Sequence, residues 1–240
     1  MYDRSHMTSR TTLLFAALAV ALPLVASAQT NPHGIYVRVS AGINTMEQED
    51  VHAGIGSAPN ELPAGEELTA AGPALTGAFG WQLRHGLRVE VEGAYRANHI
   101  TGETGLGDTA SGSERKTGVM GNVVFDVHVA RLTPYVGGGI GAQVVHEPEA
   151  TTTSSGVVVA VSVQGNASLA YQAIAGVAVP IQRVPGLSVT AEYRYLGLAG
   201  TRTYTGTATI PGVGELPLTD VSSNNRNHSL LFGIRYVFHK

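Results

Sequence analysis

Eleven ionisable residues occupy alternate positions within short segments whose other positions are largely apolar. They are Arg38, Arg84, Arg88, Glu90, Glu92, Arg96, Asp126, His128, Glu192, Arg194 and Arg235. Because successive side chains of a strand point to opposite faces, this spacing gathers the charges on one face of a sheet. An unpaired buried charge is costly, so charges on a buried face must pair. The sequence therefore predicts an ion-pair network, which would act as a structural plug or line a narrow ion path.

Two carboxylates in this set, Glu90 and Glu92, lie two positions apart on the same predicted face. Paired carboxylates can serve as general acid and general base. Here Arg88 and Arg96 flank the pair on that face and would hold both carboxylates ionised. This argues against acid–base catalysis, and no catalytic residue is assigned.

Negative charge also gathers in the intervening stretches, which contain Glu47, Glu49, Asp50, Glu61, Glu66, Glu67, Glu147 and Glu149. Such a surface suits a solvated rim, and it could also bind divalent cations or basic partners. The carboxylates do not follow the spacing of an EF-hand, and the nine His are scattered. We therefore predict no metal site and no cofactor.

The elements that position these residues are eight segments of about ten residues each, with period-two alternation. They cover 34–44, 74–84, 87–97, 117–130, 134–146, 165–181, 187–198 and 227–238. The connections alternate between short ones, such as His85-Gly86, and long ones, such as 98–116. Transmembrane barrels show this asymmetry, and their strands need about 9–11 residues to cross a bilayer. The sequence predicts an all-β, eight-stranded, antiparallel up-and-down transmembrane β-barrel.

Residues 1–28 have the composition of a secretory signal peptide. Arg10 supplies positive charge, an apolar stretch runs from Leu13 to Val25, and Ala26-Ser27-Ala28 is a small-x-small cleavage site. We expect cleavage before Gln29, which leaves residues 29–240 as one barrel domain exported to the bacterial outer membrane.

Composition excludes several other classes of protein. Charged residues make up 14% of the 240 residues and the net charge is -3, with no cluster of Lys or Arg. Nucleic-acid binding is therefore not expected. The absence of Cys excludes thiol catalysis, disulfides and cysteine metal sites.

Three stretches carry a resemblance to a known family: 133–141 (TPYVGGGIG), 191–197 (AEYRYLG) and 227–238 (NHSLLFGIRYVF). They resemble the eight-stranded OmpA-like, opacity-type outer-membrane proteins of the porin superfamily, and most nearly the surface-antigen branch of alphaproteobacteria. The resemblance implies an outer-membrane barrel. It implies no single activity, because members serve as adhesins, surface antigens, envelope stabilisers or minor pores. The final aromatic-rich segment, with Gly233, Tyr236 and Phe238, matches the signal read by the barrel assembly machinery.

We therefore expect a non-enzymatic surface protein with a charge-plugged lumen and acidic external loops. Its expected partners are outer-membrane lipids and lipopolysaccharide, the assembly machinery, and an external ligand or host surface contacted by the loops. A narrow, low-conductance porin is the first alternative. The second is a lipid-modifying hydrolase, because outer-membrane lipid A deacylases use similar barrels with a His-x-Ser spacing. In this chain His228 and Ser229 are adjacent, and adjacent strand residues point to opposite faces.

Overall fold

The structure, a computed structural model, describes residues 34–46, 52–55, 67–69, 71–103, 109–146, 150–154, 157–163, 167–199, 202–210, 214–223 and 226–238. The long strands are β1 (Gly34–Met46), β4 (Gly72–Gln82), β5 (Leu87–Glu103), β6 (Thr109–Asp126), β7 (Thr133–His146), β10 (Ala167–Pro180), β11 (Leu187–Leu198) and β14 (Arg226–Val237). The shorter strands are β2 (His52–Ile55), β3 (Glu67–Thr69), β8 (Ala150–Ser154), β9 (Val157–Val163), β12 (Arg202–Ile210) and β13 (Gly214–Ser223). The expected leader, 1–28, lies outside the described residues.

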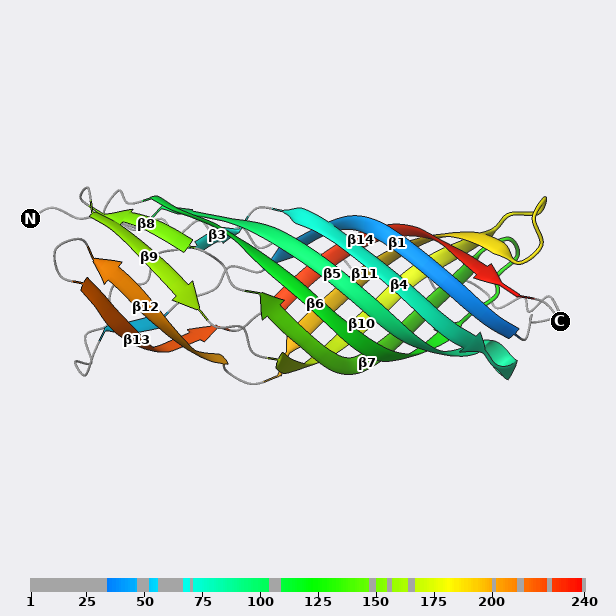
Figure 1. The fold of residues 1–240 in the computed structure, drawn as a ribbon. Coiled ribbons are helices and arrows are strands. Elements are labelled where there is room, and N and C mark those ends of the chain that lie inside the picture. Colours follow the sequence, from blue (N-terminus) through cyan, green and yellow to red (C-terminus); the bar gives the residue numbers. More distant parts are fainter. Residues whose placement is uncertain are drawn as a thin grey trace, which may run out of the picture.

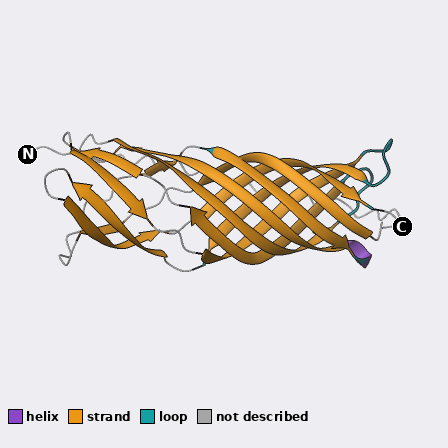
Figure 2. Ribbon diagram, viewed as in Figure 1, coloured by secondary structure: helices purple, strands orange, loops and turns teal. Residues whose placement is uncertain are grey.

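The long strands close into a barrel in the order β1-β4-β5-β6-β7-β10-β11-β14, and β14 pairs back onto β1 (Figure 1). Every pairing in this ring is antiparallel. A three-residue 3₁₀ turn, η1 (Arg84–Gly86), joins β4 to β5 at the end of the barrel where β14 also ends (Figure 2). The predicted eight-stranded up-and-down barrel is confirmed.

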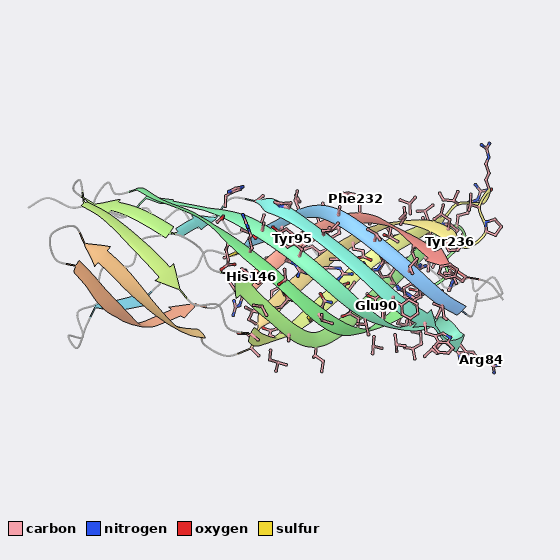
Figure 3. All side chains as sticks on the ribbon, in the orientation of Figure 1. Arg84, Glu90, Tyr95, His146, Phe232 and Tyr236 are labelled. Carbon is pink, nitrogen blue, oxygen red and sulfur yellow. The ribbon has the colours of Figure 1, made fainter. Side chains whose placement is uncertain are left out.

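Apolar and polar residues alternate along each strand, with the apolar side chains outside the barrel and the polar ones inside. This arrangement is the inverse of that in a soluble barrel. Ile140 is 69% exposed and Phe232 is 60% exposed, whereas Arg194 is 1% exposed. Tyr95 and Tyr236 also lie on the outer wall, nearer to opposite ends of the barrel (Figure 3). A closed barrel leaves no unpaired strand edge, so its backbone groups need no water. Its outer side chains are apolar, so the outer wall suits contact with lipid. No helix in the described residues is long and apolar enough to cross a membrane.

The sequence placed one long hairpin incorrectly. The sequence predicts a strand over 117–130 and a loop over 98–116, but β5 continues to Glu103 and β6 begins at Thr109. The two strands stay paired from Ala97–Arg115 out to Glu103–Thr109, with no break in register. Polar side chains on both faces suggested a loop. Backbone pairing nevertheless continues past the end of the apolar band, because a strand in water needs no apolar face.

The short strands extend this same end of the sheet away from η1 (Figure 1). The β8–β9 hairpin pairs with β6 and β12, and the β12–β13 hairpin continues the sheet to β2. The apolar run over 157–163 forms β9. The alternating segments predicted from the sequence leave a gap between 198 and 227, and β12 pairs with β13 within that gap.

A charge network in the barrel lumen as the candidate functional site

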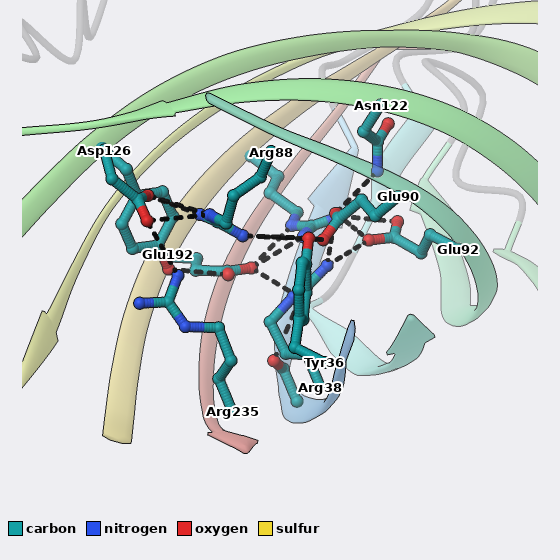
Figure 4. Close-up of polar contacts among 12 residues, drawn as sticks. Tyr36, Arg38, Arg88, Glu90, Glu92, Asn122, Asp126, Glu192 and Arg235 are labelled. Carbon is teal, nitrogen blue, oxygen red and sulfur yellow. Dashed lines mark hydrogen bonds and ion pairs between the residues drawn. The ribbon is translucent and has the colours of Figure 1, made fainter. Parts of the chain in front are cut away.

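Arg38 on β1 is the centre of the lumen network (Figure 4). Its Nη2 donates to Oε1 of Glu90 at 2.8 Å and to Oε2 of Glu92 at 2.7 Å. Its Nη1 donates to Oε2 of Glu192 at 3.0 Å. The guanidinium thus bridges two carboxylates of β5 to one of β11, and all four side chains are buried. Charge-assisted bonds of this kind are stronger than neutral ones and fix geometry.

Three polar contacts join strands on opposite sides of the ring, at three heights. Near the short-turn end, Nη1 of Arg235 on β14 lies 3.4 Å from Oδ2 of Asp126 on β6. In the middle, Nη1 of Arg194 on β11 donates to Oε1 of Glu92 on β5 at 2.6 Å. Toward the other end, Nζ of Lys116 on β6 donates to Oδ1 of Asn227 on β14 at 3.2 Å. Side chains therefore cross the whole width of the lumen repeatedly along its length.

Arg88 is held between two buried aromatic rings. Its guanidinium carbon lies 5.4 Å from the ring centroid of Tyr36 and 5.0 Å from that of Tyr135, within cation–π range. Its Nε also donates to Oδ1 of Asp126 at 2.9 Å. The two tyrosines are bound to the network as well, because the Tyr36 hydroxyl donates to Glu90 at 2.6 Å and that of Tyr135 to Glu192 at 2.7 Å.

Each tyrosine ring lies over a glycine of the neighbouring strand. A Cβ on Gly80 would come within 2.5 Å of Cζ of Tyr36, and a Cβ on Gly176 within 2.6 Å of Cζ of Tyr135. Only glycine leaves room for this close approach. The two glycines therefore leave space for the rings, whose hydroxyls hydrogen-bond to Glu90 and Glu192.

The structure brings together nine of the eleven predicted lumen residues. These are Arg38, Arg88, Glu90, Glu92, Arg96, Asp126, Glu192, Arg194 and Arg235, all of them buried. The other two were placed in the lumen wrongly. Arg84 is exposed in η1, where His85 has a φ of 60° and the reversing chain interrupts the alternation. His128 is half-buried beyond Asp126, where β6 ends and alternation no longer defines an inner face.

The prediction from sequence missed several neutral and charged members of the network. Lys116 and Glu114 are buried and form an ion pair, but they lay in the expected loop. Asn122 and Gln172 extend the network, since Gln172 donates to Asn122 at 2.7 Å and Asn122 to Glu90 at 2.9 Å. Their position on the same alternate face as the charges was the signal that could have found them.

His228 and Ser229 point to opposite sides of the barrel wall. The Ser229 hydroxyl is buried in the lumen and donates to Oδ1 of Asn44 at 2.7 Å. Nδ1 of His228 lies 2.6 Å from the hydroxyl of Tyr193, at an exposed site. Their side chains cannot act as a base–nucleophile pair, which needs direct hydrogen-bond contact. Within the described ranges, no group of three or more His, Asp or Glu side chains is placed to hold a metal ion.

The proposed assembly-signal residues lie on β14 and just after it. Gly233 and Tyr236 belong to the strand, and Phe238 follows it. The rings of Tyr236 and Phe238 contact each other edge to face, with centroids 5.0 Å apart. Both rings are on the outer wall at the short-turn end of the barrel.

A comparison with protein families agrees with the inverted barrel. The model for the outer membrane protein beta-barrel domain matches residues 12–238. The chain belongs to this family. Members of the outer membrane protein beta-barrel family lie in the bacterial outer membrane, and so does this protein. A relative from Gluconacetobacter diazotrophicus, named outer membrane protein, is 33% identical over 247 residues, covering 97% of this chain. The chain spans 64% of that relative's length.

Solved structures share the fold of this outer membrane barrel at low sequence identity. OprG from Pseudomonas aeruginosa superposes with a TM-score of 0.59 at 12% identity, over 88% of this chain and 98% of that one. Neisserial surface protein A gives 0.52 at 15% identity, over 85% and 97%. The outer membrane protease OmpT from Escherichia coli gives 0.55 at 8% identity, over 89% and 99%. Because a surface protein and a protease are both among them, the shared fold by itself assigns no activity.

Proposed function

We propose that this barrel is a non-enzymatic surface protein of the outer membrane, whose lumen is plugged and whose external strands engage a partner in envelope structure, adhesion or antigen display. The observation that carries the proposal is the Arg194–Glu92 contact across the full width of the lumen, at 2.6 Å. Contacts above and below it, Lys116–Asn227 and Arg235–Asp126, repeat the crossing. An eight-stranded interior is only wide enough for side chains to fill.

The external part of the sheet supports a role in display. Bacterial barrels keep short turns on the periplasmic side and long connections outside. Strands β8, β9, β12 and β13 extend the sheet at the end opposite the short turns, and they carry antiparallel pairing far beyond the ring. The apolar outer wall and its tyrosines suit outer-membrane lipids and lipopolysaccharide as surroundings.

The plug is tested by single-channel recording of the purified barrel in planar bilayers. We expect no conductance steps from the wild type. A variant with both Arg194→Ala and Glu92→Ala should show small steps, because it removes the central crossing. Arg84→Ala, which changes an exposed arginine, is the matched control and should remain silent. Stable ion-selective steps from the wild type would contradict the plug and favour the narrow porin.

Display is tested with an epitope inserted at 211–213, between β12 and β13. Antibody should bind intact cells that carry this insertion. The matched control carries the epitope at 182–186, the short turn between β10 and β11, and should bind antibody only after the cells are permeabilised. The reverse pattern would contradict the proposed orientation.

A further inference from the structure

Arg96 is a buried cation that the lumen network does not satisfy. Its side chain lies on the inner face of β5 and is 0% exposed. None of Nε, Nη1 and Nη2 has a hydrogen-bond partner among the residues that the structure describes. Buried guanidinium groups are normally paired and hydrogen-bonded, because desolvation of an unpaired charge is costly.

Glu92, the nearest carboxylate along the same strand face, is already engaged. Its Oε1 accepts from Nη1 of Arg194 at 2.6 Å, and its Oε2 accepts from Nη2 of Arg38 at 2.7 Å. The count of buried charges in the lumen also shows too few carboxylates for the cations. In the described lumen the buried cations are Arg38, Arg88, Arg96, Lys116, Arg194 and Arg235, and the buried carboxylates are Glu90, Glu92, Glu114, Asp126 and Glu192. Positive charge is in excess by one group, and Arg96 is the cation that makes no ion pair or hydrogen bond with a carboxylate among these described residues.

The neighbours of Arg96 add to the positive potential at this height. Arg96 pairs in register with Lys116 of the adjacent strand β6, so two cationic side chains lie next to each other on the inner face. Lys116 has Glu114 as its ion-pair partner, whereas Arg96 has no carboxylate in such contact within the described ranges, so the positive charge of Arg96 is the one left uncompensated in this cross-strand pair. Two further inner-face side chains, Thr76 and Gln143, have buried polar atoms without hydrogen-bond partners among the described residues. Their hydroxyl and amide groups could donate to a bound anion.

We propose that Arg96 is the principal ligand of a small inorganic anion, of the size of chloride, in the outward half of the lumen. The anion supplies the missing negative charge and accepts hydrogen bonds from the guanidinium. A small ion is required because side chains occupy the interior of an eight-stranded barrel. The site exists whether or not the lumen conducts, so the proposal does not depend on the plug.

The first test compares thermal unfolding of the purified barrel in sodium chloride and in sodium gluconate at equal ionic strength. Gluconate is too large for the site. We expect the wild-type midpoint to rise with chloride and to saturate, and Arg96→Gln to lose this rise. Arg84→Gln, which removes an exposed arginine, should keep it. Equal wild-type midpoints in the two salts, or a rise retained by Arg96→Gln, would overturn the proposal.

A direct test uses wild-type protein alone and so does not depend on whether Arg96→Gln folds. Crystals grown in sodium bromide should give an anomalous peak within hydrogen-bond distance of the Arg96 guanidinium. Bromide found only at the outer surface would identify an adventitious ion and overturn the assignment. A carboxylate of the chain on Arg96 in that structure would overturn it too.

Discussion

Arg194 and Glu92 connect two strands that face each other across the ring. Strands β11 and β5 are separated by three strands in either direction around the barrel, yet Nη1 of Arg194 donates to Oε1 of Glu92 at 2.6 Å. Arg194 also donates through Nη2 to Oε2 of Glu192 at 2.8 Å. One side chain therefore joins carboxylates from opposite walls of the barrel.

Removal of this guanidinium should destabilise the barrel strongly. Arg194→Met leaves Glu92 and Glu192 buried with fewer partners, and breaking a buried ion pair costs about 3–5 kcal/mol. The free energy of unfolding is measured by urea titration in lipid vesicles, with the fluorescence of Trp81 as the probe. Trp81 is the one Trp of the chain and is 57% exposed on the outer wall, where lipid surrounds it.

Arg84→Met is the control for this change. Arg84 is exposed in η1, so the same substitution should alter the free energy of unfolding by no more than about 0.5 kcal/mol. Equal effects of the two substitutions would show that the lumen contacts do not stabilise the fold.

The close approach of Tyr36 to Gly80 should make that glycine intolerant of any side chain. A Cβ at Gly80 would lie 2.6 Å from the Tyr36 hydroxyl, which donates to Glu90. Gly80→Ala therefore displaces the ring, and we expect a loss of about 1–3 kcal/mol in the free energy of unfolding. Urea titration measures it.

Gly77 provides a matched comparison on the same strand. A Cβ there would meet no atom within 4 Å. Gly77→Ala should be neutral or stabilise the strand by about 0.5 kcal/mol, because alanine loses less conformational freedom than glycine on folding. A loss as large as that of Gly80→Ala would indicate a general need for glycine in β4 and not a need for space beneath Tyr36.

Ser229→Ala separates a structural serine from a catalytic one. The substitution removes one buried hydrogen bond to Asn44, which should cost about 1 kcal/mol of stability. Hydrolysis of lipid A by purified membranes, followed by mass spectrometry, should be the same for wild type and variant. Lipid A cleavage by the wild type that disappears in the variant would restore the hydrolase hypothesis.

Phe238→Ala tests the proposed assembly signal. We expect slower assembly into liposomes that contain the barrel assembly machinery, by several fold, with little change in unfolding once the barrel is folded. Phe232→Ala is the control, because Phe232 is also an exposed phenylalanine of the outer wall but lies in the middle of β14. Equal rates for both variants would contradict a special role for Phe238.

The alternation of apolar and polar residues along the sequence determined the class of fold and identified most residues of the inner face. Arg88, Glu90 and Glu92 fall on one side of a strand whatever their partners are, because side-chain direction in a strand follows from backbone geometry alone. The same local rule placed Ser229 and His228 on opposite faces. It could not show where pairing ends, so the extension of β5 to Glu103 and the lumen position of Lys116 came only from the structure.

The choice of partners was decided by tertiary structure. Contact between Arg194 and Glu92 depends on the number of strands and on the register of each pairing around the ring, and both are properties of the closed barrel. The same closure decides that Tyr36 lies over Gly80 and that Arg96 is left without a carboxylate. Sequence alone determines which side of a strand a charge is on, because that is local. Which charge it meets depends on closure of the whole ring.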